Sequence, residues 1–299
     1  MKYSKQPISF EAQLQKLMER GLSISDSSKA LSYLSNISYY RLRAYTYPFQ
    51  DNDDPKHPFI QEISMEEIME IYTFDRKLRL LVFDAIEKIE IALRTQIIYQ
   101  WAISHGSHWH TKAALYRNDF YFGQNITSLH KEIERSHETF IKHYQEKYDD
   151  PLTPPAWMAL EVSSFGLLSL MFFNLKRSPE KKQVVRHFGL YDVELLENWM
   201  RSFTDIRNIC AHHGRLWNRR LTTQINLPKK TEIPFIENKD VYPNKLYPAL
   251  CAMAYLLDMI NEESLFKNRL VKLFGTVSPE LMGDMGFPED WQDEKFWQI

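Results

Sequence analysis

Trp199-Met-Arg-Ser-Phe-Thr-Asp-Ile-Arg-Asn-Ile-Cys-Ala-His-His-Gly-Arg-Leu-Trp-Asn-Arg-Arg220 is the stretch that decides the fold. Its apolar residues, with one from just before it, recur at the three- and four-residue spacing of an amphipathic helix; they are Leu195, Trp199, Phe203, Ile206, Cys210 and Trp217. At about 100° per residue they fall within a sector roughly 60–80° wide, which is the width of a core-facing stripe. We therefore expect a single helix that begins near Val193 and continues through the quoted stretch.

Polar side chains gather on the other side of this predicted helix. Arg201, Asp205, Asn208 and His212 form a stripe nearly opposite the apolar sector, and Arg207 lies on its flank. Ordinary exposed positions favour Lys and Glu, so Arg, Asn and His turned away from the core indicate a functional surface.

The order Arg-Asn-x-x-x-His, at Arg207, Asn208 and His212, resembles the motif of HEPN nucleases, a family of helical RNases. The wider stretch up to Arg219 resembles the pattern of the Abi-like (AbiD/AbiF) abortive-infection proteins of bacteria. Four other stretches carry the same likeness, which covers nearly the whole chain: residues 37–42, 74–80, 86–95 and 285–288. The resemblance implies a HEPN-like helical bundle and an endoribonuclease that acts in anti-phage abortive infection.

The composition is that of an ordinary globular protein, with 44% hydrophobic and 25% charged residues. Nine glycines argue against a glycine-rich nucleotide fold and favour long helices. The net charge of −2 means that RNA binding requires a local basic patch. The chain has two cysteines, too few for a disulfide framework, and we see no apolar leader and no apolar run long enough for a bilayer. We therefore expect a reduced, cytoplasmic protein with no membrane contact.

The fold class that we expect is all-α. Residues 1–60 should form an N-terminal helical module rich in aromatic and basic residues, residues 61–275 a HEPN-like helical core, and residues 276–299 an extended, docked acidic tail. We expect helices from Ser9, from Ser27, and over residues 64–104, 128–148, 156–175, 193–217, 247–260 and 263–274, and a basic turn at residues 176–182. In the tail, Phe287, Trp291 and Trp297 should be the docking residues.

Three further sets of residues leave two interpretations open. Arg41 and Arg43 alternate with tyrosines, which favours either aromatic packing or a surface for stacking and steering RNA. Glu90 and Arg94 are four residues apart on the long helix and form either a structural ion pair or a brace for the motif helix. Glu161 should be buried with a partner from another helix.

The histidines His105, His108 and His110 could suggest a metal site. However, they lie where a helix breaks and lack an obvious carboxylate or cysteine companion, so we expect no metal and no cofactor.

The chemistry of the motif is that of RNA cleavage by the RNA's own 2′-hydroxyl. His212 can move a proton near neutral pH, and general acid–base help is worth roughly 10²–10⁴-fold. Arg207 can hold the phosphoryl oxygens with two parallel hydrogen bonds. Asn208 can bind the imidazole or the RNA, and Asp205 could set the tautomer of His212.

One such helix supplies a single proton-transfer histidine, because His213 should project toward the core as a structural residue. HEPN nucleases pair two motif helices across a two-fold interface, so we expect a homodimer whose polar stripes face each other. Arg201 of the polar stripe should also bind RNA. The basic rim around the RNA should come from five residues that a solvated loop explains equally well, Arg215, Arg219, Arg220, Lys229 and Lys230.

The family resemblance also implies a restraining partner, which is a small noncoding RNA in some members, and a protein regulator is the other option. One alternative function is a non-catalytic RNA-binding or protein-interaction module. Another is nucleotide transfer, which is known among HEPN relatives, but the sequence shows no phosphate-cradling glycine loop.

Overall fold

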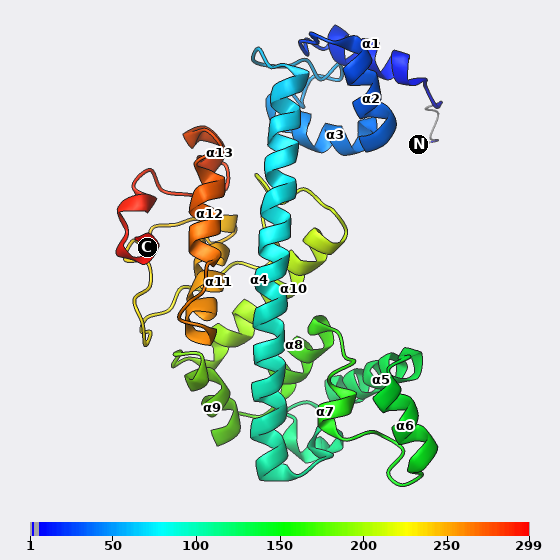
Figure 1. Ribbon diagram of the computed structural model, residues 1–299, viewed down its shortest axis with the longest axis vertical. Coiled ribbons are helices and arrows are strands. Elements are labelled where there is room, and N and C mark those ends of the chain that lie inside the picture. Colours follow the sequence, from blue (N-terminus) through cyan, green and yellow to red (C-terminus); the bar gives the residue numbers. More distant parts are fainter. Residues whose placement is uncertain (1, 3–5, 299) are drawn as a thin grey trace. The chain divides into compact units, whose positions relative to one another are not determined.

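The computed structural model describes residues 2 and 6–298, and within these the chain is helical with no strand (Figure 1). Extended pairing there is confined to isolated bridges such as that between Ser23 and Ser64. The all-α class expected from the sequence is confirmed. Contacts divide the chain into two compact units, Met1–Arg79 and Leu80–Ile299. None of the described helices combines the length and apolarity needed to cross a membrane.

The first unit is built from short helices that begin at the residues that the sequence indicates. Ser9 accepts a hydrogen bond from the backbone of residue 12 and starts the first helix, and Gly21, with φ 103°, follows its end. Asp26 caps the second helix. The elements are α1 (Phe10–Glu19), α2 (Ser27–Ile37), α3 (Tyr39–Thr46), the 3-10 turn η1 (Tyr47–Phe49) and the first part of α4 (Met65–His105).

A buried polar network joins α3 to α4 within this unit. The Tyr45 hydroxyl donates to Asp75 Oδ2 at 2.6 Å and accepts from Arg79 Nη1 at 3.0 Å, and Arg79 also forms an ion pair with Asp75. All three side chains are buried, and burial raises the pKa of Tyr45. Tyr40, in contrast, is 82% exposed. The aromatic–basic stretch therefore contains both a tyrosine that packs in the core, Tyr45, and one that faces solvent, Tyr40.

The long helix α4 follows from its first turn and its apolar spacing. Ser64 and Glu67 form a capping box, because the Ser64 hydroxyl accepts from the Glu67 backbone at 3.2 Å and the Glu67 carboxylate accepts from the Ser64 backbone at 2.7 Å. Buried residues then recur along one face, as at Val82, Ile89 and Leu93. The helix predicted over residues 64–104 is therefore confirmed.

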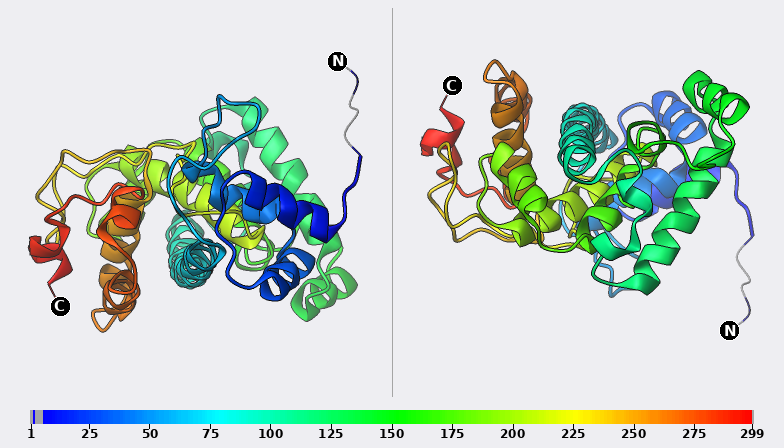
Figure 2. Two further views of the ribbon diagram at one scale, coloured as in Figure 1. Left: turned by 90° about the horizontal axis from the view of Figure 1, so that it is seen from above. Right: turned by 90° about the horizontal axis from the view of Figure 1, so that it is seen from below.

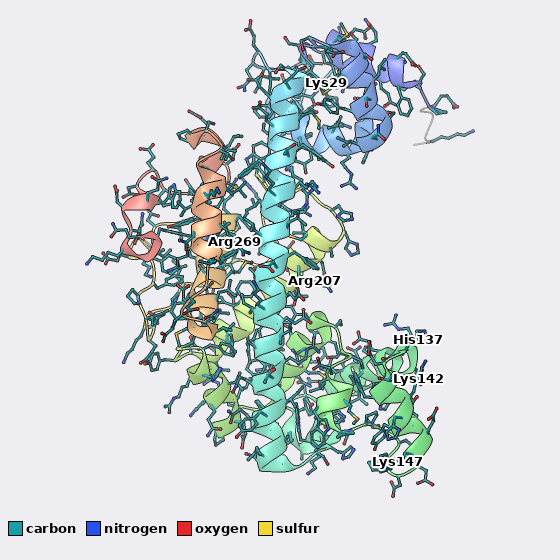
Figure 3. The ribbon with its side chains drawn as sticks, viewed as in Figure 1. Lys29, His137, Lys142, Lys147, Arg207 and Arg269 are labelled. Atoms are coloured by element: carbon teal, nitrogen blue, oxygen red, sulfur yellow. The ribbon has the colours of Figure 1, made fainter. Side chains whose placement is uncertain are left out.

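In the second unit, α10 is the central helix and packs against α8, α9 and α11. Residues of two other helices approach α4 in Figure 3: Arg207 of α10 stacks on Phe83, and Arg269 of α12 lies 3.8 Å from Asp84. Figure 2 shows α4 end-on, with α11 and α12 on one side. The helices are α5 (Asp119–Arg135), α6 (Thr139–Lys147), α7 (Ala156–Ala159), α8 (Phe165–Asn174), α9 (Pro179–His187), α10 (Val193–Ala211), α11 (Leu246–Ile260), α12 (Phe266–Phe274) and α13 (Pro279–Gly283), with 3-10 turns η2 (Trp109–Thr111), η3 (Ala113–Leu115), η4 (Trp291–Asp293) and η5 (Lys295–Trp297).

Two predicted helices are each broken in two. The helix expected over residues 156–175 splits into α7 and α8, because Ser164 has an extended backbone and caps α8 through its hydroxyl. Glu161 lies in the resulting turn and is exposed, so the prediction of a buried Glu161 is wrong. The helix expected over residues 128–148 splits into α5 and α6, because Ser136 and Glu138 are both extended.

The predicted basic turn at residues 176–182 is also wrong in part, since its second half begins α9. Ser178 caps this helix, and Lys181 points into the core, where its amine lies 2.6 Å from Glu197 of α10. Burial lowers the pKa of Lys181 to about 8. A lysine-rich sequence suggested exposure, but the pair with Glu197 makes burial of one lysine tolerable.

The tail is docked as expected, with Phe287, Trp291 and Trp297 all buried. It is not extended, however, because α13, η4 and η5 fold it into short helical turns. Both cysteines, Cys210 of α10 and Cys251 of α11, are buried thiols of the second unit.

Candidate functional site

The motif helix ends earlier than the sequence predicts. α10 stops at Ala211, and the Gly214 amide bonds to the Ile209 carbonyl at 2.8 Å while the His213 amide bonds to the Cys210 carbonyl at 3.0 Å. These two bonds make a Schellman motif, in which the residue after the cap takes a left-handed conformation. Here that residue is His213, with φ 57°. The expectation of one helix through residue 220 is therefore wrong.

This ending changes the direction of His213. Because the chain reverses after His212, the His213 side chain does not continue the helical stripe and is exposed. The prediction that it projects toward the core is wrong. Trp217 is nevertheless buried, because the segment that follows the helix folds back onto the core.

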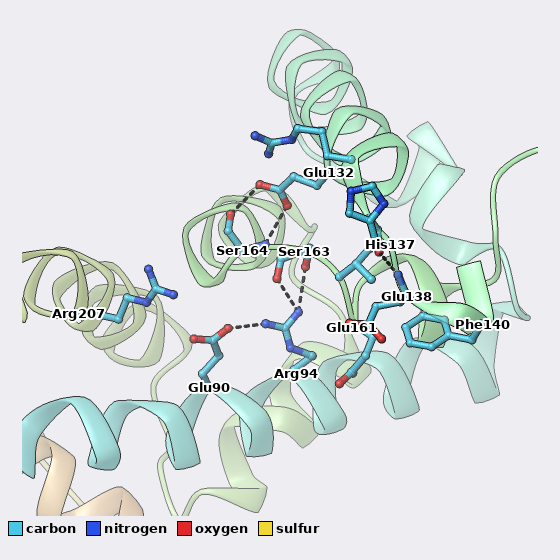
Figure 4. A pocket seen from close by; sticks show the side chains of 13 residues that line it. Glu90, Arg94, Glu132, His137, Glu138, Phe140, Glu161, Ser163, Ser164 and Arg207 are labelled. Carbon is cyan, nitrogen blue, oxygen red and sulfur yellow. Dashed lines mark hydrogen bonds and ion pairs between the residues drawn. The ribbon is translucent and has the colours of Figure 1, made fainter. Parts of the chain in front are cut away.

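Arg207 is half-buried and lies with its guanidinium carbon 5.7 Å from the centre of the Phe83 ring. Such stacking holds a guanidinium in place while it leaves the edge donors available. Within the described part of the chain, the guanidinium has neither a hydrogen bond nor an ion pair. Figure 4 shows it pointing into a cavity from α10.

Asn208 and His212 are both exposed, and His212 is the C-cap residue of α10. The backbone amide of His212 bonds to the Asn208 carbonyl at 3.0 Å. Asp205, predicted to set the tautomer of His212, instead accepts a hydrogen bond from Thr223 Oγ1 at 2.7 Å. Asp205 thereby holds the segment after the helix.

Glu90 and Arg94 form the predicted ion pair on α4, and Arg94 also contacts the α7–α8 turn. Its guanidinium also donates to the carbonyls of Leu160 and Ser163 and, at 3.0 Å, to Ser163 Oγ. Arg94 is only 6% exposed. The pair therefore fixes the turn between α7 and α8, which forms a wall of the cavity that Arg207 enters.

This cavity has a volume of about 780 Å³, which is within the range for small-molecule sites. Its walls come from α4, the last turn of α5 with the α5–α6 connection and the first turn of α6, the turn between α7 and α8, and α10 (Figure 4). The part around the α5–α6 connection was not predicted; it brings in Arg135 at the end of α5, His137 and Glu138 in the connection, and Phe140 in the first turn of α6. No spacing in the sequence links these residues to Arg207, so no signal could have found them.

Four of the arginines predicted to bind RNA are divided between the middle of α10, which carries Arg201, and the segment that follows this helix. Arg201, Arg219 and Arg220 are exposed, while Arg215 stacks on Trp217 and donates to the Asn218 carbonyl at 3.2 Å. These four arginines do not line the cavity. The other predicted RNA-binding residues, Arg41 and Arg43, belong to the first unit, where Arg43 lies 3.5 Å from His57.

Of the histidines considered as metal ligands, His108 and His110 stack with their ring centres 6.2 Å apart, whereas His105 contacts another helix. His110 is completely buried, and within the described chain neither of its ring nitrogens has a hydrogen-bond partner. Burial lowers its pKa to about 4. His105 lies 3.5 Å from Glu180 of α9. The described residues contain no group of three or more histidine, cysteine or acidic side chains arranged to hold a metal ion.

Comparison with known proteins gives one match. A family model described as Abi-like protein matches residues 32–218, which include α10 and all the residues that line the cavity. No curated protein and no solved structure matches the chain.

Proposed function

Because the chain belongs to the Abi-like protein family, we propose that it is a metal-independent endoribonuclease of the HEPN type that acts in bacterial anti-phage abortive infection. The family points to phage defence. The observation that carries the enzymatic part is Arg207, a cation that lies over the Phe83 ring, has no hydrogen bond or ion pair in the described chain, and enters a cavity large enough for a nucleotide.

Arg207 suits the stabilisation of a reacting phosphate. A guanidinium presents two parallel donors to phosphoryl oxygens and keeps its charge at any physiological pH. Since Phe83 holds it from one face and no carboxylate neutralises it, the donors are available without breaking an existing ion pair. Preorganised donors of this kind are typically worth about 10²–10³-fold in rate.

His212 would transfer the proton. In the proposed step, the 2′-hydroxyl loses its proton to a base and its oxygen forms a bond to phosphorus. The bond from phosphorus to the 5′-oxygen then breaks, and that oxygen gains a proton. The products are a 2′,3′-cyclic phosphate and a 5′-hydroxyl. Metal is not needed for this scheme, because an imidazole supplies the proton transfer and a guanidinium supplies the charge.

The scheme uses an acid and a base, whereas the polar stripe of α10 ends in one histidine, the C-cap residue His212, since the chain reverses before His213 and takes it off that stripe. We propose that a second copy of the chain supplies the other, in a homodimer whose α10 stripes face each other. The exposed Asn208 and His212 support this arrangement, since both are accessible on that stripe. A small noncoding RNA or a protein would restrain the enzyme in the cell.

The test is incubation of purified protein with total RNA in EDTA, followed by mapping of the cut ends. We expect the wild-type protein to cut, and Arg207→Lys and His212→Gln to cut at least about 100-fold more slowly. The control is Glu134→Gln, which changes an exposed side chain of α5. A change at Ser202 of α10 would not serve, because Ser202 is buried. Cleavage that EDTA abolishes would reject the metal-free mechanism, and undiminished cleavage by both variants would reject the site.

A non-catalytic RNA-binding module is the second candidate. The exposed arginines near the end of α10 favour it, since they could hold a phosphate backbone without any chemistry. It predicts RNA binding by wild type and His212→Gln alike, with no cut ends from either.

A further inference from the structure

The cavity beside Arg207 has a second end with a different chemistry. Glu138 follows α5, Phe140 lies in the first turn of α6, and Glu161 lies in the α7–α8 turn. Figure 4 shows these three residues on the side of the cavity away from Arg207. The cavity therefore offers a cation at one end and, at the other, two carboxylates, the imidazole of His137 and an aromatic ring.

The two carboxylates at that end are uncommitted. Neither Glu138 nor Glu161 forms an ion pair or a side-chain hydrogen bond with any residue that the structure describes, and both side chains are exposed. The other carboxylates of the cavity are occupied, because Glu90 pairs with Arg94 and Glu132 accepts from the amide and hydroxyl of Ser164 at 2.8 and 2.9 Å.

We propose that this end is a base-binding subsite that selects guanine in the RNA strand whose phosphate Arg207 holds. The inference rests on the proposed function for its choice of RNA as ligand. Phe140 is half-buried, so part of its ring is open for a base to stack on. The volume of about 780 Å³ accommodates a nucleotide with room for its neighbour.

Guanine is favoured by its hydrogen-bonding edge. It is the one base of the four with two adjacent donors on its Watson–Crick edge, N1–H and the N2 amino group, and a carboxylate can accept both in parallel. Uracil presents carbonyl oxygens on both sides of its single donor, which a carboxylate repels. Adenine and cytosine each combine one amino group with a ring acceptor. A site built to satisfy two donors rejects a base that lacks them.

The test measures binding to the full-length protein, independent of cutting. The probes are two RNA-like pentamers with 2′-deoxyriboses to block cleavage, one with a central guanine among uracils and one of uracil alone. We expect wild type to bind the guanine pentamer at least about 10-fold more tightly, and an inosine pentamer, which lacks the N2 amino group, to fall between the two.

The variant Glu138→Gln with Glu161→Gln should reduce the guanine preference to less than about 3-fold, because an amide replaces one acceptor by a donor. Glu134→Gln, which alters an exposed α5 carboxylate outside the cavity, should keep the full preference. Circular dichroism confirms that each variant is folded. Equal binding of the guanine and uracil pentamers by wild type, or full preference in the double variant, would overturn the proposal.

The cleavage assay separates this proposal from the function on which it rests. Guanine-selective binding without any cut RNA would remove the nuclease and leave the subsite. Cut RNA with no guanine preference in the binding assay would remove the subsite and leave the nuclease.

Discussion

Replacing Arg94 by alanine should destabilise the second unit more than an ordinary surface change would. Arg94 is nearly fully buried, pairs with Glu90 and donates to the carbonyls of Leu160 and Ser163. Leu160 would keep another donor, since the Ser163 hydroxyl bonds to its carbonyl at 2.7 Å. The Ser163 carbonyl would lose its donor, and the Glu90 charge would lose its partner. Breaking such a buried pair costs about 3–5 kcal/mol.

Urea unfolding followed by tryptophan fluorescence measures this cost. All seven tryptophans lie in the second unit, so the signal reports that unit. Arg94→Lys keeps a charge for Glu90 but cannot reach every acceptor, so we expect an intermediate loss of about 1–3 kcal/mol. The same variants should cut RNA more slowly, because the α7–α8 turn shapes the cavity.

Lys88→Ala is the matched control for Arg94. Lys88 pairs with Asp84 on the same helix with the same four-residue spacing, at 2.8 Å, but both side chains are about half exposed. Its loss should cost no more than about 0.5 kcal/mol. If Lys88→Ala and Arg94→Ala reduce the free energy of unfolding equally, burial and the turn contacts are not what makes the Arg94 pair matter.

Two other buried ionisable groups give predictions of their own. The pKa of His110 is about 4, whereas the same group in the unfolded chain titrates near 6.5, so the unfolded chain binds more protons between these values. The free energy of unfolding should therefore fall by about 3 kcal/mol as pH falls from 6.5 to 4. Urea titrations at several pH values measure this dependence, and His110→Phe should flatten it. The control His143→Gln, which changes an exposed histidine, should leave it unchanged. Lys181→Met should cost about 3–5 kcal/mol, because it removes the buried amine and leaves Glu197 only the longer contact to Arg117, at 3.9 Å. A second change, Glu197→Leu, should restore much of this loss. The neighbouring exposed Lys182→Met should move the unfolding midpoint little, and an equal effect would contradict a buried pair.

The sequence predicted those elements whose local signals agree with their packing. α4 has a capping box at Ser64 and Glu67 and a continuous apolar face, so its limits were correct within a residue. α11 was recognisable by its uninterrupted apolar composition. The end of α10 was not, because a left-handed histidine closes it where glycine is the usual signal. Apolar Trp217 then appeared to extend a helix that had already ended.

The candidate site was predictable only in the part that a single helix carries. Arg207, Asn208 and His212 lie near one another in the sequence, so a motif could reveal them. The residues that complete the cavity come from turns between helices, and tertiary packing alone brings Glu138 and Glu161 to it. Likewise, the acceptors of Arg94 are backbone carbonyls almost seventy positions later in the chain, and a carbonyl leaves no signature in sequence.

The two buried thiols allow transient opening of the second unit to be measured in the unmodified protein. The thiolate is the form of cysteine that attacks an alkylating reagent, and burial raises the pKa of Cys251 well above its usual value, so the packed state reacts slowly. Cys210 is also buried, although 6% of its surface is exposed, and the first unit has no cysteine. The rate at which iodoacetamide modifies the native chain therefore reports how often α10 and α11 open to solvent, without any engineered probe.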